Sequence, residues 1–152
     1  MPARIVQVML FSIVPWVELR LAIPYGITKG LPPVVACLAA ITASWVMIIP
    51  MFLVLDLFYH RFLSGVPVVR WGIEEVRNRG RGYVERWGVL GVGIYVSLPL
   101  PGPGIYSGTI LAWLFGLPRR QAVIALALGS TVSALLVTII STGVIALIRR
   151  FA

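Results

Sequence analysis

A run of eight residues decides the fold of this chain: Ser97-Leu98-Pro99-Leu100-Pro101-Gly102-Pro103-Gly104. Residues 99–104 contain three prolines and two glycines. They cannot remain helical, because each proline lacks a backbone N–H and clashes with the preceding turn. On either side the sequence predicts a short apolar helix, Gly88–Leu98 and Ile105–Leu117, within a stretch (87–118) that carries no charge.

At about 1.5 Å per residue, each of these helices is roughly 16–20 Å long, about half of the ~30 Å hydrocarbon core of a bilayer. Two half-length helices joined by a break predict a re-entrant hairpin, which enters the membrane and returns to the same side. The break must then be buried in protein or line a wet cavity, because lipid cannot satisfy its polar groups. The alternative is one kinked helix that spans the membrane.

The first apolar block has the same build. A short helix over Ile5–Val14 is expected before a break at Pro15, and a second over Val17–Ile27 after it. The opening residues resemble a signal peptide, but no small-x-small cleavage site follows. We therefore expect this block to belong to the mature protein.

Two further blocks are long, continuous and uncharged. Gly30–Leu55 has 26 residues and Gln121–Ile148 has 28. A spanning helix needs about 20 apolar residues, so both are predicted to cross the membrane, with Pro50 as a candidate kink in the first.

A repeat relates the two halves of the sequence. After a shift of 86 positions, Gly30-Leu31-Pro32 falls on Gly116-Leu117-Pro118 and Pro15 falls on Pro101. If each half is a hairpin plus one span, the second half begins on the opposite face, an arrangement that many transporters use. We therefore predict an all-α polytopic membrane protein of two inverted repeats, each a re-entrant helical hairpin plus one transmembrane helix. Its single domain, residues 1–152, divides into repeat 1 (5–58), a basic amphipathic linker (60–87) and repeat 2 (88–150).

The composition supports a membrane protein. The chain is 59% hydrophobic and 12% charged, with a mean hydropathy of +0.97. Average globular chains carry about 25% charged residues, so this chain has too few to cover a soluble domain of its size. Its net charge of +8 comes largely from arginines at the ends of apolar runs, as in loops beside membrane spans. Nucleic acid is therefore not an expected partner.

The segment from His60 to Arg86 contains six arginines and three glutamates. Its apolar residues recur at near-helical spacing, which indicates an amphipathic segment on the membrane surface, interrupted at Gly80 and Gly82. A solvated basic loop is the alternative.

The distribution of basic residues between the two sides of the membrane depends on the topology. With re-entrant hairpins, 4 basic residues lie on one side and 8 on the other, and with four full spans the numbers are 3 and 9. Both place this segment in the cytoplasm, and charge alone favours four spans. The short lengths of the predicted helices favour re-entrant hairpins instead. We therefore expect a multi-pass protein of the cell membrane.

Glu18 and Arg20 are the clearest candidates for a functional site. They follow the break at Pro15, where an ionisable group costs at least about 2.5–3.5 kcal/mol and normally faces a cavity or a partner. Partial removal from water raises the pKa of a carboxyl group, which suits proton uptake and release. A guanidinium stays charged and holds phosphate or carboxylate. A structural ion pair is the alternative.

The second candidate is the break itself. Its glycines permit close backbone approach, and the helix that begins near Ile105 directs free N–H groups at the midplane, where they attract anions. The alternative is that these glycines only allow the two hairpin tips to pack. The predicted binding residues of this segment are Pro101, Gly102, Gly104, Tyr106 and Ser107.

Other chemistry is not expected. His60 has no neighbouring ligands for a metal, and Asp56 is expected to be solvated or paired with Arg61. The lone His and the lone Cys37 lie on different segments, so no nucleophilic set forms and we expect neither an enzyme nor a cofactor. A stripe of small residues predicts a helix–helix contact, within the chain or across a homo-oligomer: Ala122, Ala125, Gly129 and Ser133.

Two stretches of the sequence form a recognisable pair of motifs: Pro15-x-x-Glu18-x-Arg20-x-x-Ile23-Pro24-x-Gly26 and Pro99-x-Pro101-Gly102-x-Gly104-x-Tyr106-Ser107-Gly108. In both motifs, in their order and spacing, the sequence resembles the family of small multidrug export proteins. The resemblance covers nearly the whole chain. The family is similar to the DedA/VTT superfamily, whose core is two facing re-entrant hairpins plus transmembrane helices.

The resemblance implies proton-dependent transport or the movement of lipids between leaflets. It assigns the working acidic group to Glu18, but the arginine expected in the second hairpin is missing, which weakens the case for a phosphate-bearing lipid. We expect a transporter or lipid translocase with its site between the hairpin tips. Its expected partners are membrane lipids, a small anionic or lipid substrate and protons. A non-transporting membrane scaffold with a structural Glu18–Arg20 pair is the alternative.

Overall fold

The computed structural model describes residues 1–15, 17–58, 66–100 and 102–151. Within these ranges every regular element is an α-helix. In chain order the helices are α1 (Pro2–Ile13), α2 (Glu18–Thr28), α3 (Pro33–Phe58), α4 (Pro67–Trp87), α5 (Val89–Ser97), α6 (Ile105–Leu114) and α7 (Arg119–Phe151).

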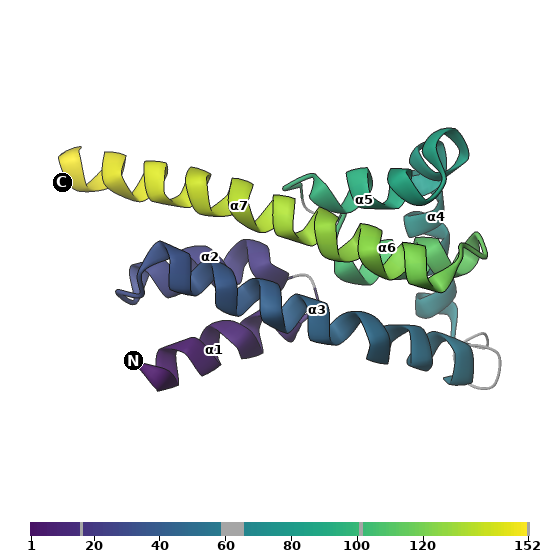
Figure 1. The fold of residues 1–152 in the computed structure, drawn as a ribbon, viewed down its shortest axis with the longest axis horizontal. Coiled ribbons are helices and arrows are strands. Elements are labelled where there is room, and N and C mark those ends of the chain that lie inside the picture. The colour runs from purple at the N-terminus through teal and green to yellow at the C-terminus, as the bar shows by residue number, and fades with distance from the viewer. Residues whose placement is uncertain (16, 59–65, 101, 152) are drawn as a thin grey trace.

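The predicted breaks are confirmed. α1 ends and α2 begins on either side of Pro15, and α5 and α6 lie on either side of the segment with three prolines. α1 and α5 approach the middle of the molecule from opposite ends, and α2 and α6 run back from it (Figure 1). Both short pairs are therefore helical hairpins whose tips lie near the centre of the molecule.

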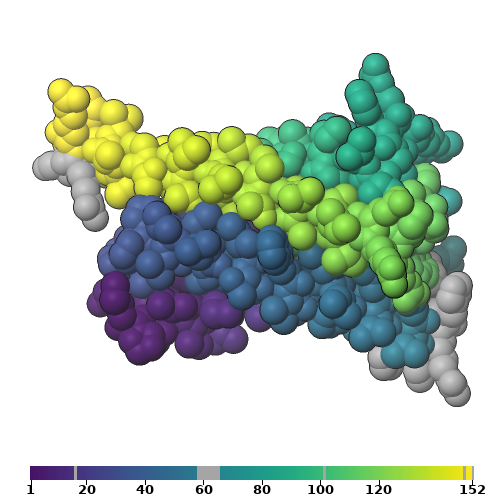
Figure 2. All heavy atoms as spheres, viewed as in Figure 1, coloured from purple at the N-terminus to yellow at the C-terminus, as the bar shows by residue number. Residues whose placement is uncertain are grey.

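The two long helices form its axis. α3 has 26 residues and α7 has 33, and they lie side by side in opposite directions (Figure 1). In the described part of the chain these two are the helices long and apolar enough to cross a membrane. α3 continues through Pro50. Figure 2 shows both long helices on one face of the molecule. Both helices carry large exposed apolar side chains, such as Ile49 of α3 and Ile139 of α7.

The two halves begin their long helices in the same way. The Leu31 N–H donates to the Gly26 carbonyl at 3.0 Å, and 86 positions later the Leu117 N–H donates to Ala112 at 3.0 Å. The preceding glycine has a positive φ in both places, 84° at Gly30 and 60° at Gly116. This is the glycine-ended helix stop in which the left-handed residue allows the chain to reverse. The Gly-Leu-Pro triplet that occurs twice in the chain, 86 positions apart, therefore forms the same turn in both halves.

The helix contacts also match between the halves. α1 and α2 pack against each other and against α3, and α5 and α6 pack against each other and against α7. α2 additionally contacts α7, and α6 contacts α3. Each hairpin thus has its own apolar core at one end of the long helices: one core contains Ile23 and Ala36, and the other contains Val96 and Leu111.

The predicted stripe of small residues forms a contact within the chain. Gly129 of α7 lies against Gly93 of α5, and a Cβ added at Gly129 would lie 2.5 Å from the Gly93 carbonyl oxygen. Ala122, Ala125 and Ser133 on the same face are buried. Small residues allow the two backbones to approach this closely.

α4 corrects one expectation. The sequence predicted an interruption at Gly80 and Gly82, but the helix is continuous from Pro67 to Trp87. Gly80 is needed for packing, because a Cβ there would overlap the Leu111 side chain of α6. The helix packs against α5 and α6, and its exposed surface pairs arginines with glutamates, such as Arg79 with Glu75 at 2.6 Å.

Asp56 lies near the end of α3 and pairs with Arg119 at the start of α7. It also accepts a hydrogen bond from the Trp113 indole at 3.0 Å. The partner predicted for Asp56 was Arg61, which lies outside the described residues, as does His60.

Candidate functional site between the hairpin tips

Glu18 is the first residue of α2 and lies at the tip of the first hairpin. It is buried, with 7% of its surface exposed. Its φ is +43°, and it is the one non-glycine residue with positive φ in the part of the chain that the structure describes. Side chains rarely adopt this conformation, because Cβ then crowds the backbone, and such strain persists where the surrounding structure holds it. The tip therefore aims this carboxylate in a fixed direction.

The Glu18 carboxylate lies at the N-terminus of α6, in the other half of the chain. Its Oε1 accepts a hydrogen bond from the Tyr106 N–H at 3.4 Å, and a Cβ added at Gly104 would overlap both carboxylate oxygens. The first N–H groups of a helix have no partner within it and attract negative charge. The anion site predicted at this helix start is thus occupied by a carboxylate of the chain itself.

Arg20 lies beside Glu18 and extends across to the second hairpin. Its Nη1 is 3.6 Å from Glu18 Oε2, and its Nη2 donates a hydrogen bond to the Leu98 carbonyl at 2.8 Å. In return, the Tyr106 hydroxyl donates to the Ile13 carbonyl at the end of α1. Each half therefore donates hydrogen bonds to the tip of the other, and the two tips are in direct contact.

The second tip is held by Ser107. The Gly104 N–H donates to Ser107 Oγ at 2.8 Å, and Ser107 Oγ lies 2.8 Å from the Gly102 carbonyl, to which its hydroxyl donates. Gly102 has a φ of +115°, a conformation that favours glycine. Among the predicted binding residues, Pro101 lies outside the described residues.

The structure adds two residues that sequence reasoning missed. Tyr95 of α5 is 2% exposed, and its hydroxyl faces Ser107 without a hydrogen bond of normal geometry. The buried Nε of Arg20 also lacks an acceptor among the described atoms. The Tyr95 hydroxyl and the Arg20 Nε–H are thus two buried donors that remain available to a ligand or water with hydrogen-bond acceptors.

The second missed residue is Arg79. It comes from α4, and its Nη1 would lie 3.0 Å from a Cβ added at Gly102. The second tip thus has an arginine beside it, although its own segment, 87–118, contains none. No local signal separated Arg79 from the other arginines of α4, because only the docking of α4 on α5 and α6 brings it there.

These groups have the chemistry to bind an anion and to take up or release a proton. A carboxylate and a guanidinium, Glu18 and Arg20, lie at the start of α6. A second guanidinium, that of Arg79, lies beside Gly102 at the adjacent tip and also pairs with Glu75. Such a cluster suits an oxyanion or a proton. In the described residues, no group of three His, Cys, Asp or Glu side chains could hold a metal ion.

Two long apolar helices, an apolar surface and a buried charged cluster between two hairpins define a helical membrane protein. The chain belongs to the family described as putative small multi-drug export protein, which matches residues 18–136, from the first tip through most of α7. The predicted family is therefore confirmed, and its description names export. No curated protein and no solved structure matches this chain.

Proposed function

We propose that this protein is a multi-pass transporter of the cell membrane whose substrate site lies between the two hairpin tips. The observation that carries the proposal is the contact of Glu18 and Arg20 with the opposite tip. Two ionisable groups inside an apolar helical protein are costly, and they normally mark a path for ions or substrate.

The proposal includes two re-entrant hairpins related as an inverted repeat. Antiparallel α3 and α7, matching helix contacts and the repeated glycine turn all support this arrangement. The lengths of the short helices support it as well. α5 has 9 residues and α6 has 10, and each is too short to cross a ~30 Å core.

In the proposed mechanism, Glu18 exchanges its place with an anionic substrate. While ionised, its carboxylate occupies the start of α6 and offsets the charge of Arg20. Protonation removes that negative charge and leaves Arg20 and the Tyr106 N–H available to a substrate carboxylate or phosphate. Proton binding and anion binding then favour each other, which couples transport to the proton gradient.

The substrate class follows from the donors around the site. Arg20, Arg79 and the Tyr95 hydroxyl can all donate hydrogen bonds to a ligand, so the bound group is an acceptor-rich anion. A small organic anion and the headgroup of an anionic lipid share this chemistry. The headgroup would make the protein a lipid translocase.

Reconstituted liposomes test the proposal. We would measure flipping of fluorescently labelled phosphatidylglycerol with dithionite, and proton entry with trapped pyranine, under an imposed pH gradient. The Glu18→Gln variant is expected to lose the proton dependence. The control, Glu74→Gln, alters an exposed carboxylate paired with Arg77 and should behave as the parent. Unchanged proton-dependent transport of the lipid in Glu18→Gln would sink the role given to this residue.

A membrane scaffold is the second candidate. The observation that favours it is the mutual bonding of the tips through Arg20 and Tyr106, which also fits a purely structural role. If the pair is structural, the Glu18→Gln/Arg20→Gln double variant should fold and function where each single variant fails, because neither charge is left alone. A double variant that folds but does not transport supports the transporter.

A further inference from the structure

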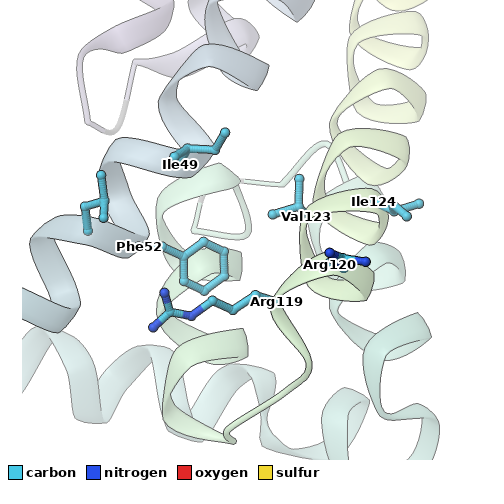
Figure 3. A pocket seen from close by; sticks show the side chains of 7 residues that line it. Ile49, Phe52, Arg119, Arg120, Val123 and Ile124 are labelled. Carbon is cyan, nitrogen blue, oxygen red and sulfur yellow. The ribbon is translucent and has the colours of Figure 1, made fainter.

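A groove lies between α3 and α7, away from the hairpin tips and at the end of the molecule where α7 begins. It has a volume of about 490 Å³ (Figure 3). Its walls are apolar and come from both long helices: Ile49, Phe52 and Leu53 from α3, and Val123 and Ile124 from α7. Ile49 and Ile124 are 61% and 60% exposed, so the groove opens to the surroundings of the two spans.

Two arginines close one end of this groove. Arg119 and Arg120 are the first residues of α7, and both line the groove. Arg119 pairs with Asp56 and Arg120 adds a second cation, so this end of the groove keeps a net positive charge. The first turn of α7, all of it within the described residues, holds no acidic residue. Cations at the positive end of a helix dipole are unfavourable until an anion neutralises them.

The combination of apolar walls and a cationic end fits one class of ligand. We propose that the groove binds an anionic phospholipid, with an acyl chain along Ile49, Leu53 and Ile124 and the phosphate at Arg119 and Arg120. The height in the membrane agrees, because these arginines lie where two spanning helices end and begin, at the level of lipid headgroups. The proposal requires α3 and α7 to face lipid and does not depend on transport at Glu18.

Native mass spectrometry of the detergent-solubilised protein tests the site with phosphatidylglycerol and phosphatidylcholine. We expect phosphatidylglycerol to bind more tightly. Arg120→Gln should weaken its binding about fivefold, because one basic residue near anionic headgroups contributes about that factor. Arg120 is used first, since Arg119→Gln would also leave Asp56 without its ion pair. Equal binding of both lipids by the parent would overturn the proposal.

Two further variants separate the groove from a general basic surface. Arg77→Gln/Arg81→Gln removes two exposed charges of α4 and should leave binding unchanged. Leu53→Trp/Ile124→Trp keeps both arginines but fills the groove, and it should abolish the preferred binding. Equal loss in the α4 control, or no loss in the filled groove, would show that charge alone attracts the lipid.

A soluble headgroup and a second protein chain are the remaining occupants to test. Glycerol phosphate, which has the phosphate and no acyl chain, should not compete at millimolar concentration. Effective competition would reassign the site to a free anion. If the parent instead dimerises without phosphatidylglycerol and the filled-groove variant is monomeric, the groove is an interface between copies and the lipid proposal is wrong.

Discussion

At the scale of single residues, Glu18 combines three structural constraints. Its backbone adopts a positive φ, its side chain is buried, and its carboxylate lies against the backbone of Gly104. These two positions are also 86 apart, so they correspond to each other in the sequence repeat. In the proposed inverted repeat, a residue that contacts its own counterpart is expected near the pseudo-twofold axis between the halves.

The contact predicts that Gly104 accepts no side chain. In Gly104→Ala the new methyl group would overlap the Glu18 carboxylate and displace it from the start of α6. Overpacking of this kind costs about 1–3 kcal/mol, so we expect a lower Tm in detergent, measured by tryptophan fluorescence.

Gly82→Ala is the matched control, because a Cβ at Gly82 meets no atom within 4 Å. It lies inside α4, where alanine is a better helix former than glycine, so its Tm should be unchanged or higher. If both variants melted like the parent, the close contact between the tips would be wrong.

At the scale of elements, the crossing of α5 and α7 depends on glycines that face each other. A Cβ at Gly129 would meet the backbone of Gly93, and backbone atoms cannot rotate away as a flexible side chain can. The two helices must therefore separate if Gly129 gains a side chain. This separation would reach the second tip, because α5 leads directly into it.

Gly129→Ala is accordingly expected to lower the Tm by an amount corresponding to about 1–3 kcal/mol. Gly143→Ala, on the same helix, meets no atom within 4 Å and should leave the Tm unchanged. Thermal unfolding of both variants in one detergent gives the comparison. Equal Tm values for the two would contradict the close crossing.

At the scale of the whole molecule, the two chain ends and α4 lie at opposite ends of the long axis (Figure 1). With re-entrant hairpins only α3 and α7 cross the membrane, so α4 and the C-terminus face opposite sides. With four full spans they would face the same side. Sidedness therefore distinguishes the two topologies without knowledge of the substrate.

The prediction is tested with single cysteines at Arg77 and Arg150, both exposed, in a Cys37→Ser background. A membrane-impermeant thiol reagent added to intact cells should label one position and not the other until the membrane is opened. Labelling of both positions from the same side would make the second hairpin (α5 and α6) a full span, and the inverted repeat would fail.

Most of the helices were predictable from sequence because local chemistry sets their limits. Prolines follow the ends of α1 and α5, and glycine turns end α2 and α6. The structure begins α3 and α7 at positions 86 apart, at Pro33 and Arg119. The expected interruption of α4 was wrong, because tertiary packing outweighs the local preference of glycine there. Glycine weakens an isolated helix, but packing of Leu111 against Gly80 holds this one together.

The candidate site was predictable only in part. Glu18 and Arg20 stood out because charge is rare in apolar sequence, and the glycines and Ser107 because they surround a break. Tyr95 gave no such signal, since an aromatic residue in an apolar helix is normally a core residue. Its hydroxyl became relevant only once packing buried it beside Ser107.

The sequence by itself determined the helical class, the two long helices, the breaks and the family, because hydrophobicity, proline and charge act over a few neighbouring residues. Only the tertiary structure decided which groups meet. It placed the Glu18 carboxylate at the start of α6, brought Arg79 to the second tip, and paired Asp56 with Arg119. These contacts join residues 23 to 88 positions apart, and the packing of whole helices sets such distances, which no local pattern encodes.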